Sequence, residues 1–310
     1  MSEAPFFAAE ADAPAGVHAV WLTPGGVRIR AAWWKAGDKG TVVLLPGRTE
    51  CIEKYGRAVG DLVARGYSVI TTDWRGQGLS DRAMTDRMSG HVDDFAEYQA
   101  DLDALLAEAD RAELPQPRFV LAHSLGGCIG LRGLMRGLPF RAAAFSAPMW
   151  GISMAAWLRP VAPMVTALYG LFGLSQSYAP GTGPKTYLTD APFEGNVLTT
   201  DRAMWDYMKA QVVAHPELSL GGPSVAWLGA ALHECAALAR MPAPNLPAIC
   251  ALGTAEKVVD VPPVHLRMAG WSNGQLDLYP GAEHEIMMEG PSVRARFFDR
   301  AASLFDANRR

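Results

Sequence analysis

The alternation of short apolar runs with stretches of helical periodicity is the feature that most constrains the fold of this chain. Apolar runs lie at Thr41–Leu45, 67–71 and 118–122, and helical stretches at 55–65 and 95–109 separate them. A continuous apolar run bounded by turn residues is typical of a strand that is buried on both faces. Strand, helix, strand, helix, strand predicts an α/β fold with a mostly parallel sheet and helices on both faces.

The sheet is expected to open with an antiparallel hairpin and to continue late in the chain. Val17–Leu22 and 27–34 alternate in part and flank a Thr-Pro-Gly-Gly turn, which predicts two paired strands. The further predicted elements are strands at 142–146, 248–252 and 275–278 and helices at 128–136 and Pro291–Ala307.

The strand-helix rhythm is lost between residue 147 and residue 247, where Met, Trp, Tyr, Gly and Pro are frequent. A length of 310 residues corresponds to about two domains or to one large domain with an insertion. We therefore expect a core domain formed by residues 1–147 and 248–310, and a mainly helical cap inserted at 148–247.

Charge and cysteine usage exclude several classes of protein. The 28 basic and 32 acidic side chains give a net charge of −4, which provides no attraction for nucleic acid. The four cysteines are far apart and form no C-x-x-C pair, so free thiols are expected rather than a zinc site or a disulfide framework.

The sequence pattern favours neither a secreted protein nor one that spans a membrane. Residues 1–16 carry acidic side chains and no basic residue before an apolar run, which is unlike a secretory signal and favours a cytoplasmic address. The most apolar stretch, 149–174, is interrupted by Arg159, Pro160 and Pro163, whereas a membrane span needs about 20 nearly uninterrupted apolar residues.

A candidate nucleophile follows the predicted strand at 118–122 directly. Ser124 lies between that strand and a helix-compatible run, with the small residues Ala122 and Gly126 two positions away on either side. A sharp strand-to-helix turn needs small neighbours at these two positions and exposes the serine hydroxyl. It also places the Leu125 amide at a helix start, where unpaired N–H groups favour a developing oxyanion.

A serine nucleophile needs a histidine base and a carboxylate that orients it. His284 follows the last predicted strand, whereas the other six histidines are expected to have packing or surface roles. Two carboxylates follow the strand at 248–252. Glu256 is favoured because it lies close to the strand end, while Asp260 precedes Val261-Pro262 and suits the cap of the next helix. Asp260 remains the alternative acid.

A second oxyanion donor is expected from the loop at 46–50, which follows the first buried parallel strand at the same edge of the sheet. The backbone amide of Arg48 is the candidate. The segment from Asp73 to Asp81 is rich in turn formers and charge, and we expect it to support the site loops structurally.

These residues resemble the α/β-hydrolase fold and, within it, the serine hydrolases that include monoacylglycerol lipases and bacterial lysophospholipases. The matching segments are the loop at 46–50 with Glu53-Lys54-Tyr55, the segment 73–80, the Ser124 turn, 253–256 and 281–284. The resemblance implies that Ser124 is the nucleophile, Glu256 the acid and His284 the base, with the Arg48 and Leu125 amides as the oxyanion hole.

The chain departs from the family pattern at three positions. Ala122 replaces the usual glycine of the turn, Pro46 replaces a histidine found in many relatives, and Glu256 replaces the commoner aspartate. Alanine is small enough for the turn, the Pro46 change leaves the amide donors intact, and a longer carboxylate still reaches an imidazole.

We therefore expect hydrolysis of a carboxylic ester through an acyl-enzyme, with no metal or organic cofactor required. The region 148–247 supplies apolar side chains that suit an acyl chain, which favours a small lipid-like ester such as a lysophospholipid or a monoacylglycerol. The same surface leaves open a transient contact with a membrane. These side chains are Met149, Trp150, Ile152, Met154, Trp157, Leu158, Met164, Leu168, Tyr169, Leu171 and Phe172.

Other functions use the same scaffold. A thioesterase, a haloperoxidase-like enzyme or a carbon–carbon bond hydrolase would use the same triad, and a non-catalytic ligand-binding protein could share the fold. The presence of all three candidate triad residues argues against the binding protein. Dehalogenases and epoxide hydrolases resemble this scaffold but carry an aspartate where this chain has Ser124.

Overall fold

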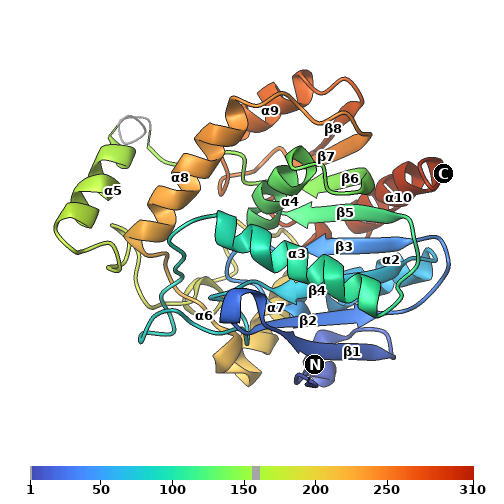
Figure 1. Ribbon diagram of the computed structural model, residues 1–310, viewed down its shortest axis with the longest axis horizontal. Coiled ribbons are helices and arrows are strands. Elements are labelled where there is room, and N and C mark those ends of the chain that lie inside the picture. The colour runs from blue at the N-terminus through green and yellow to red at the C-terminus, as the bar shows by residue number, and fades with distance from the viewer. Residues whose placement is uncertain (1, 156–160) are drawn as a thin grey trace.

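The computed structural model of the protein describes residues 2–155 and 161–310. They form an eight-stranded sheet in the order β1-β2-β4-β3-β5-β6-β7-β8 (Figure 1). Strand β2 pairs antiparallel with β1 and with β4, and every other neighbouring pair is parallel. The mostly parallel sheet is confirmed. The strands are β1 (Val17–Leu22), β2 (Ile29–Trp34), β3 (Thr41–Leu45), β4 (Ser68–Asp73), β5 (Arg118–His123), β6 (Phe140–Ser146), β7 (Ala248–Gly253) and β8 (Gly274–Tyr279).

Helices cover both faces of this sheet, with α3 and α4 on one face and α2 and α10 on the other (Figure 1). The α-helices are α1 (Ala8–Ala11), α2 (Gly56–Ala64), α3 (Ala96–Arg111), α4 (Leu125–Met135), α5 (Ala162–Leu171), α6 (Tyr187–Asp190), α7 (Arg202–Ala214), α8 (Val225–Ala239), α9 (Val261–Ala269) and α10 (Pro291–Ala307). Short 3-10 helices are η1 (Pro24–Gly26), η2 (Ile52–Tyr55), η3 (Pro216–Leu218) and η4 (Ile286–Met288).

Strand β3 shows why the central strands are continuous apolar runs in the sequence. Val43 and Leu45 pack in the core layer beneath α3 and α4, whereas Val42 and Leu44 pack in the layer beneath α2 and α10. Successive side chains of a strand point to opposite faces, so a strand covered on both sides needs apolar residues at nearly every position. All of the predicted strands occur, with ends that differ by at most two residues.

Helix α4 begins at Leu125, directly after Ser124, as expected for the strand-to-helix turn. The helix-compatible run in the sequence begins only at Cys128. Gly126 and Gly127 are poor helix formers, and this lowers the local helical signal. Tight packing requires them there, because a Cβ on Gly127 would lie 2.5 Å from the Cβ of Pro148.

The chain between β6 and β7 contributes helices to both sides of the molecule. Helix α8 packs on α4 and against α5, at the left of Figure 1. Helix α7 packs on α1 instead, and the Tyr207 hydroxyl donates to the Ala11 carbonyl oxygen at 2.7 Å. The boundaries of a separate cap at 148–247 stay a prediction.

Two further predictions concern the cysteines and membrane-spanning helices. All four cysteines are buried free thiols. Among the described residues, no helix has both the length and the apolar character needed to cross a bilayer. Trp157 and Leu158, which were expected to contribute to an acyl-chain surface, lie outside the described residues.

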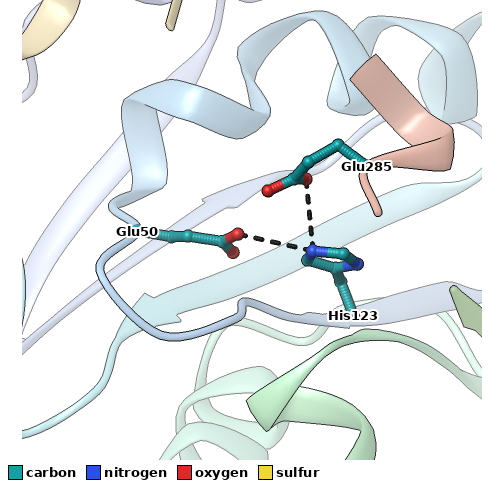
Figure 2. A group of neighbouring side chains, drawn as sticks. All are labelled: Glu50, His123 and Glu285. Carbon is teal, nitrogen blue, oxygen red and sulfur yellow. Dashed lines mark ion pairs between the residues drawn. The ribbon is translucent and has the colours of Figure 1, made fainter. Parts of the chain in front are cut away.

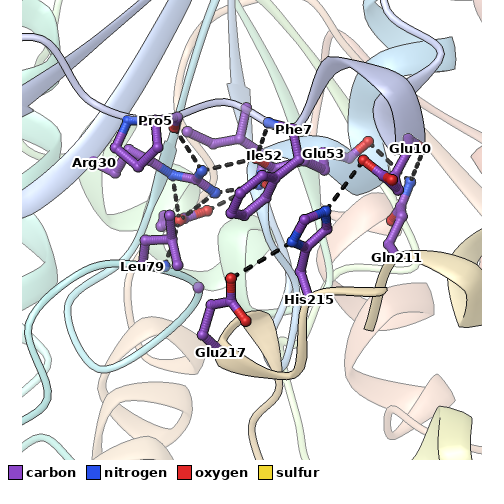
Figure 3. A network of polar contacts seen from close by, with 12 residues as sticks. Pro5, Phe7, Glu10, Arg30, Ile52, Glu53, Leu79, Gln211, His215 and Glu217 are labelled. Carbon is purple, nitrogen blue, oxygen red and sulfur yellow. Dashed lines mark hydrogen bonds and ion pairs between the residues drawn. The ribbon is translucent and has the colours of Figure 1, made fainter. Parts of the chain in front are cut away.

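A buried arginine joins β2, β4 and the segment after β3. The Arg30 guanidinium donates to the two Glu53 carboxylate oxygens at 2.7 and 2.6 Å (Figure 3). It also donates to Asp73 Oδ2 at 2.8 Å. None of these three side chains is exposed to solvent. Asp73 also accepts from the backbone N–H groups of Ile52 and Leu79, each at 2.8 Å. The contacts hold together the loops that follow β3 and β4 at the carboxyl edge of the sheet.

We expect the substitution Arg30→Met to lower the free energy of unfolding by about 3–5 kcal/mol, because it leaves two buried carboxylates without their counter-charge. Urea denaturation of the purified protein measures this change. The control is Arg28→Met, which removes the exposed Arg28–Asp81 pair and is expected to cost less than about 1 kcal/mol. Equal losses in the two variants would contradict the role of the buried contacts.

Candidate active site

Ser124 lies in a strained turn between β5 and α4. Its φ of 49° and ψ of −116° lie outside the regions that L-residues ordinarily adopt. The turn is held by the Ser124 carbonyl oxygen, which accepts from the N–H groups of Gly127 at 2.9 Å and Met149 at 2.8 Å. Strain of this kind persists only where the surroundings enforce it, and it is concentrated at functional sites. The predicted strand-to-helix turn at Ser124 is present.

The start of α4 approaches the end of β3 so closely that only glycine fits at residue 126. A Cβ on Gly126 would lie 2.1 Å from the Leu45 carbonyl oxygen and 2.6 Å from the Pro46 carbonyl oxygen. The first N–H groups of a helix have no partner within the helix, and Leu125 is the first residue of α4. The close approach therefore brings the Leu125 amide to the loop that contains Arg48.

That loop is held from both sides of Arg48. Gln77 donates from Nε2 to the Gly47 carbonyl oxygen at 3.1 Å and accepts from the Thr49 N–H at 3.0 Å. The Gly47 N–H donates to Glu50 Oε2. Within the described part of the chain, the Arg48 N–H donates to no acceptor. Gln77 belongs to the segment 73–81, which contacts the loop as a structural support.

The second half of the candidate site comes from the loops after β7 and β8. His284 Nδ1 and Glu256 Oε2 are 2.7 Å apart, and the two side chains are 4% and 1% exposed. A Cβ on Gly253 would lie 2.2 Å from the Ala282 carbonyl oxygen, so this glycine allows the two loops to pass closely. The Glu256 Oε1 atom accepts from the N–H groups of Val258 and Val259 at 2.6 and 3.0 Å.

These contacts distinguish the two carboxylates that the sequence left open. Burial raises the pKa of the Glu256 carboxyl, but the bonds from His284 and from the two amides outweigh it and hold that pKa below its usual value. Glu256 is thus ionised at neutral pH against the imidazole. Asp260 occupies the N-cap position of α9 without a side-chain bond to the helix, and its N–H donates to the Gly151 carbonyl oxygen. The structure brings together His284 and Glu256.

His123, the residue directly before Ser124, lies against His284. The ring centroids of His123 and His284 are 4.7 Å apart, at an interplanar angle of 52°. Ser124 is 8% exposed and His284 is 3% exposed, so both lie just beneath the surface. The strand order places β3, β5, β7 and β8 with their carboxyl ends at one edge of the sheet, which is the edge where open α/β sheets bind ligands.

A cluster of four ionisable side chains lies behind these residues, and we call it the buried ion cluster: Glu50, Lys54, His123 and Glu285. Lys54 Nζ donates to Glu50 Oε1 at 2.5 Å and to Glu285 Oε1 at 2.6 Å. His123 Nε2 lies 3.1 Å from Glu285 Oε2 and 3.5 Å from Glu50 Oε1 (Figure 2). Glu50 comes from the 46–50 loop, Lys54 from η2, His123 from the end of β5 and Glu285 from the loop after β8.

Charge balance explains how this cluster is tolerated in the interior. Burial lowers the pKa of His123, but Glu285 and Glu50 outweigh it and raise that pKa above its usual value. Burial raises the pKa of Glu285, but His123 and Lys54 hold it well below its usual value. The stability from His123 is therefore present at low pH and is lost as pH rises through its raised pKa, while that from Glu285 is lost as pH falls through its lowered pKa.

The same cluster contains the atoms best placed to bind a metal. Ligand atoms of Glu50, His123 and Glu285 lie within 4.8 Å of one another. The Lys54 ammonium already bridges the two carboxylates, so an entering cation would have to displace it. Two basic side chains against two acidic ones make the cluster an internal ion network rather than a site that lacks a cation.

The sequence pattern does not predict this cluster, and it favours a packing or surface role for His123. A local signal was present, because His123 directly precedes Ser124, Glu285 directly follows His284, and Glu50 lies two residues after Arg48. The sequence signal for the cluster is thus a charged residue one or two positions from a candidate site residue.

The arrangement has the parts that acyl transfer to serine requires. A hydroxyl lies on a strained turn, an ionised carboxylate contacts an imidazole, and the Leu125 amide lies at a helix start. An oxyanion that forms near Ser124 would meet the amide of Leu125 and the positive end of the α4 dipole.

The comparisons with known proteins agree with the predicted resemblance. Residues 36–291 match the family described as serine aminopeptidase, S33. Lysophospholipase L2 of Escherichia coli strain K12 is 31% identical over 264 residues, which cover 82% of this chain and 76% of that protein. Probable lysophospholipase L2 of Haemophilus influenzae is 27% identical over 255 residues, which cover 82% of this chain and 79% of that protein.

The fold is shared with solved structures as well. A soluble variant of monoglyceride lipase from Saccharomyces cerevisiae, in complex with a substrate analog, has a TM-score of 0.71 at 20% sequence identity, and the match covers 94% of this chain and 95% of that chain. The family match extends over most of the chain, from the end of β2 to the start of α10. The chain therefore belongs to the serine aminopeptidase S33 family of α/β-hydrolases and is a relative of lysophospholipase L2.

Proposed function

We propose that this protein hydrolyses the carboxylic ester of a lipid-like substrate, a lysophospholipid or a monoacylglycerol, through an acyl-enzyme on Ser124. The observation that carries the proposal is the 2.7 Å contact between His284 and Glu256 at the sheet edge where Ser124 occupies its strained turn. The lipid class rests on relatives named lysophospholipase L2 and on a neighbour named monoglyceride lipase.

The site residues act in sequence in this reaction. His284 removes the Ser124 proton while the hydroxyl oxygen attacks the ester carbonyl carbon, and Glu256 stabilises the imidazolium that forms. The Arg48 and Leu125 amides stabilise the oxyanion. His284 then protonates the leaving alcohol, and water releases the fatty acid by the same steps.

A fluorophosphonate probe tests the nucleophile. We expect one label per wild-type molecule and none on Ser124→Ala, because the probe reacts only with an activated serine. His284→Ala is expected to slow labelling strongly, since the base is lost. Mass spectrometry of the intact protein measures the label, and circular dichroism shows whether each variant is folded.

An unlabelled wild-type protein would favour a ligand-binding protein on the same fold. The same preparation reports the substrate class through a series of nitrophenyl esters. A rise of kcat/KM with acyl length supports a lipid substrate, whereas a preference for two- to four-carbon acyl chains contradicts it.

A pair of isosteric variants tests the acid. We expect Glu256→Gln to lower kcat on a nitrophenyl ester about 10,000-fold, because the amide no longer stabilises the imidazolium. The control Asp260→Asn is expected to keep kcat close to the wild-type value. If only Asp260→Asn abolished turnover, the acid would be Asp260 and the assignment of Glu256 would be wrong.

One face of α5 and the turn after it support the expected contact with a membrane. Met164, Leu168 and Leu171 follow one another at helical spacing and are 58%, 43% and 81% exposed, and Phe172 and Leu174 continue the patch. An exposed apolar row marks an interaction surface, and a lipid-ester hydrolase meets its substrate at a bilayer. The buried Met149 and Trp150 belong to the core instead. The cytoplasmic address stays a prediction.

Flotation with phosphatidylcholine vesicles tests this contact. We expect the wild-type protein to float with the vesicles and the double variant Leu171→Ser, Phe172→Ser to stay in the aqueous fraction, because the variant removes apolar area that the bilayer would cover. The matched control is Leu266→Ser on α9, which changes a leucine that is 78% exposed elsewhere. Equal flotation of all three proteins, or none, would contradict the contact.

A further inference from the structure

The Arg48 side chain lies between the core and the segment that leads into α8. Its Nη2 atom donates to the Gly221 carbonyl oxygen at 2.7 Å, and its guanidinium carbon lies 5.1 Å from the centroid of the Trp227 ring. Both partners are neutral. No carboxylate pairs with Arg48 in residues 2–155 and 161–310, in contrast to the buried Arg30 with its two carboxylates.

A half-buried guanidinium without an anion is costly, because its charge has lost part of its water without gaining a counter-charge. The Nε atom of Arg48 is buried and has no hydrogen-bond partner. Burial lowers the pKa of Arg48 to about 10. A guanidinium carries five N–H donors, and most of those of Arg48 have no protein acceptor among the described residues.

The surroundings hold this group in one place. A Cβ on Gly90 would lie 2.5 Å from Arg48 Nη2, so the absence of a side chain at residue 90 makes room for the guanidinium. The Trp227 ring beneath it is fixed by the bond from Nε1 to the Tyr98 hydroxyl oxygen at 3.0 Å. A cation fixed on an aromatic face is preorganised for an anion, because little side-chain entropy remains to be lost on binding.

We propose that the Arg48 guanidinium binds the phosphate group of a lysophospholipid substrate while the backbone amide of the same residue stabilises the oxyanion. This subsite rests on the proposed function and deepens it. In a lysophospholipid the glycerol unit separates the acyl ester from the phosphate, and in Arg48 the side-chain carbons separate the amide from the guanidinium. The planar fork of arginine matches two phosphate oxygens.

Arg82 provides a comparison within the same chain. Burial lowers its pKa to about 10 as well. Its guanidinium, however, donates to three carbonyl oxygens, those of Gly76 at 2.5 Å, Gly78 at 2.8 Å and Ser219 at 3.3 Å. Arg82 thus stabilises loops through neutral acceptors, and it is the matched control for loss of a half-buried arginine.

The test compares a lysophosphatidylglycerol and a monoacylglycerol that carry the same acyl chain. We expect Arg48→Gln, which keeps the backbone amide, to lower kcat/KM for the lysophospholipid about 10- to 100-fold. For the monoacylglycerol, kcat/KM should fall by a smaller factor, so that the ratio of the two kcat/KM values falls about 10-fold or more. Arg48→Lys should recover part of the loss, because it restores a positive charge without the planar fork. Arg82→Gln should change both substrates by the same factor.

Two outcomes would overturn the subsite. One is an equal fall of kcat/KM on both substrates in Arg48→Gln, which would make Arg48 a support of the loop. The other is an unchanged kcat/KM for the lysophospholipid. A third arm adds inorganic phosphate or sn-glycerol 3-phosphate to the monoacylglycerol reaction. Stronger inhibition by glycerol 3-phosphate supports a lipid headgroup, and stronger inhibition by inorganic phosphate identifies a free-phosphate site and contradicts the proposal.

If the wild-type protein cleaves neither ester, the proposed function fails and the subsite is judged separately. Calorimetric titration with sn-glycerol 3-phosphate then decides. Binding to the wild type that weakens about 10-fold or more in Arg48→Gln supports the phosphate site. No binding, or equal binding by both proteins, overturns it.

Discussion

The close approach of two backbones at Gly126 is the constraint on which the candidate site depends. It places the first turn of α4 against the end of β3, and a side chain as small as a methyl group would collide with the Leu45 carbonyl oxygen. The strained Ser124 turn and the proximity of the Leu125 amide to the Arg48 loop both follow from this contact. The geometry for acyl transfer is thus built first of backbone atoms, with side chains added to it.

The buried ion cluster joins the three segments that this backbone geometry leaves separate. Glu50 accepts from the Gly47 N–H beside Arg48, His123 precedes Ser124, and Glu285 follows His284. Lys54 bridges the two carboxylates, so displacement of any one segment would leave a charge unpaired in the interior. Breaking such a buried pair costs about 3–5 kcal/mol. The cluster therefore makes the relative position of the three segments an energetic requirement.

The sheet was predictable, and the candidate site residues could be selected from the sequence, because their signals are local. Apolar runs define the strands, and Ser124, Glu256 and His284 each lie in a loop that follows a strand. The partners of Lys54 were not predictable in this way, because Lys54 and Glu285 are 231 positions apart and meet only through the strand order. For the same reason, the sequence does not predict that α7 and α8 pack on different sides of the molecule. Both helices are amphipathic enough to pack, but sequence periodicity does not say which face of the sheet receives them.

The position of β7 and β8 at the end of the chain has a consequence during protein synthesis. Glu256 and His284 follow the last two strands of the sheet, whereas Ser124 and Arg48 lie in its first half. A nascent chain in which β7 and β8 have not yet been made lacks both proposed partners of Ser124. Under the proposed mechanism the hydroxyl therefore stays unreactive until translation is nearly complete. The order of the elements thus links the proposed activity to synthesis of nearly the whole chain.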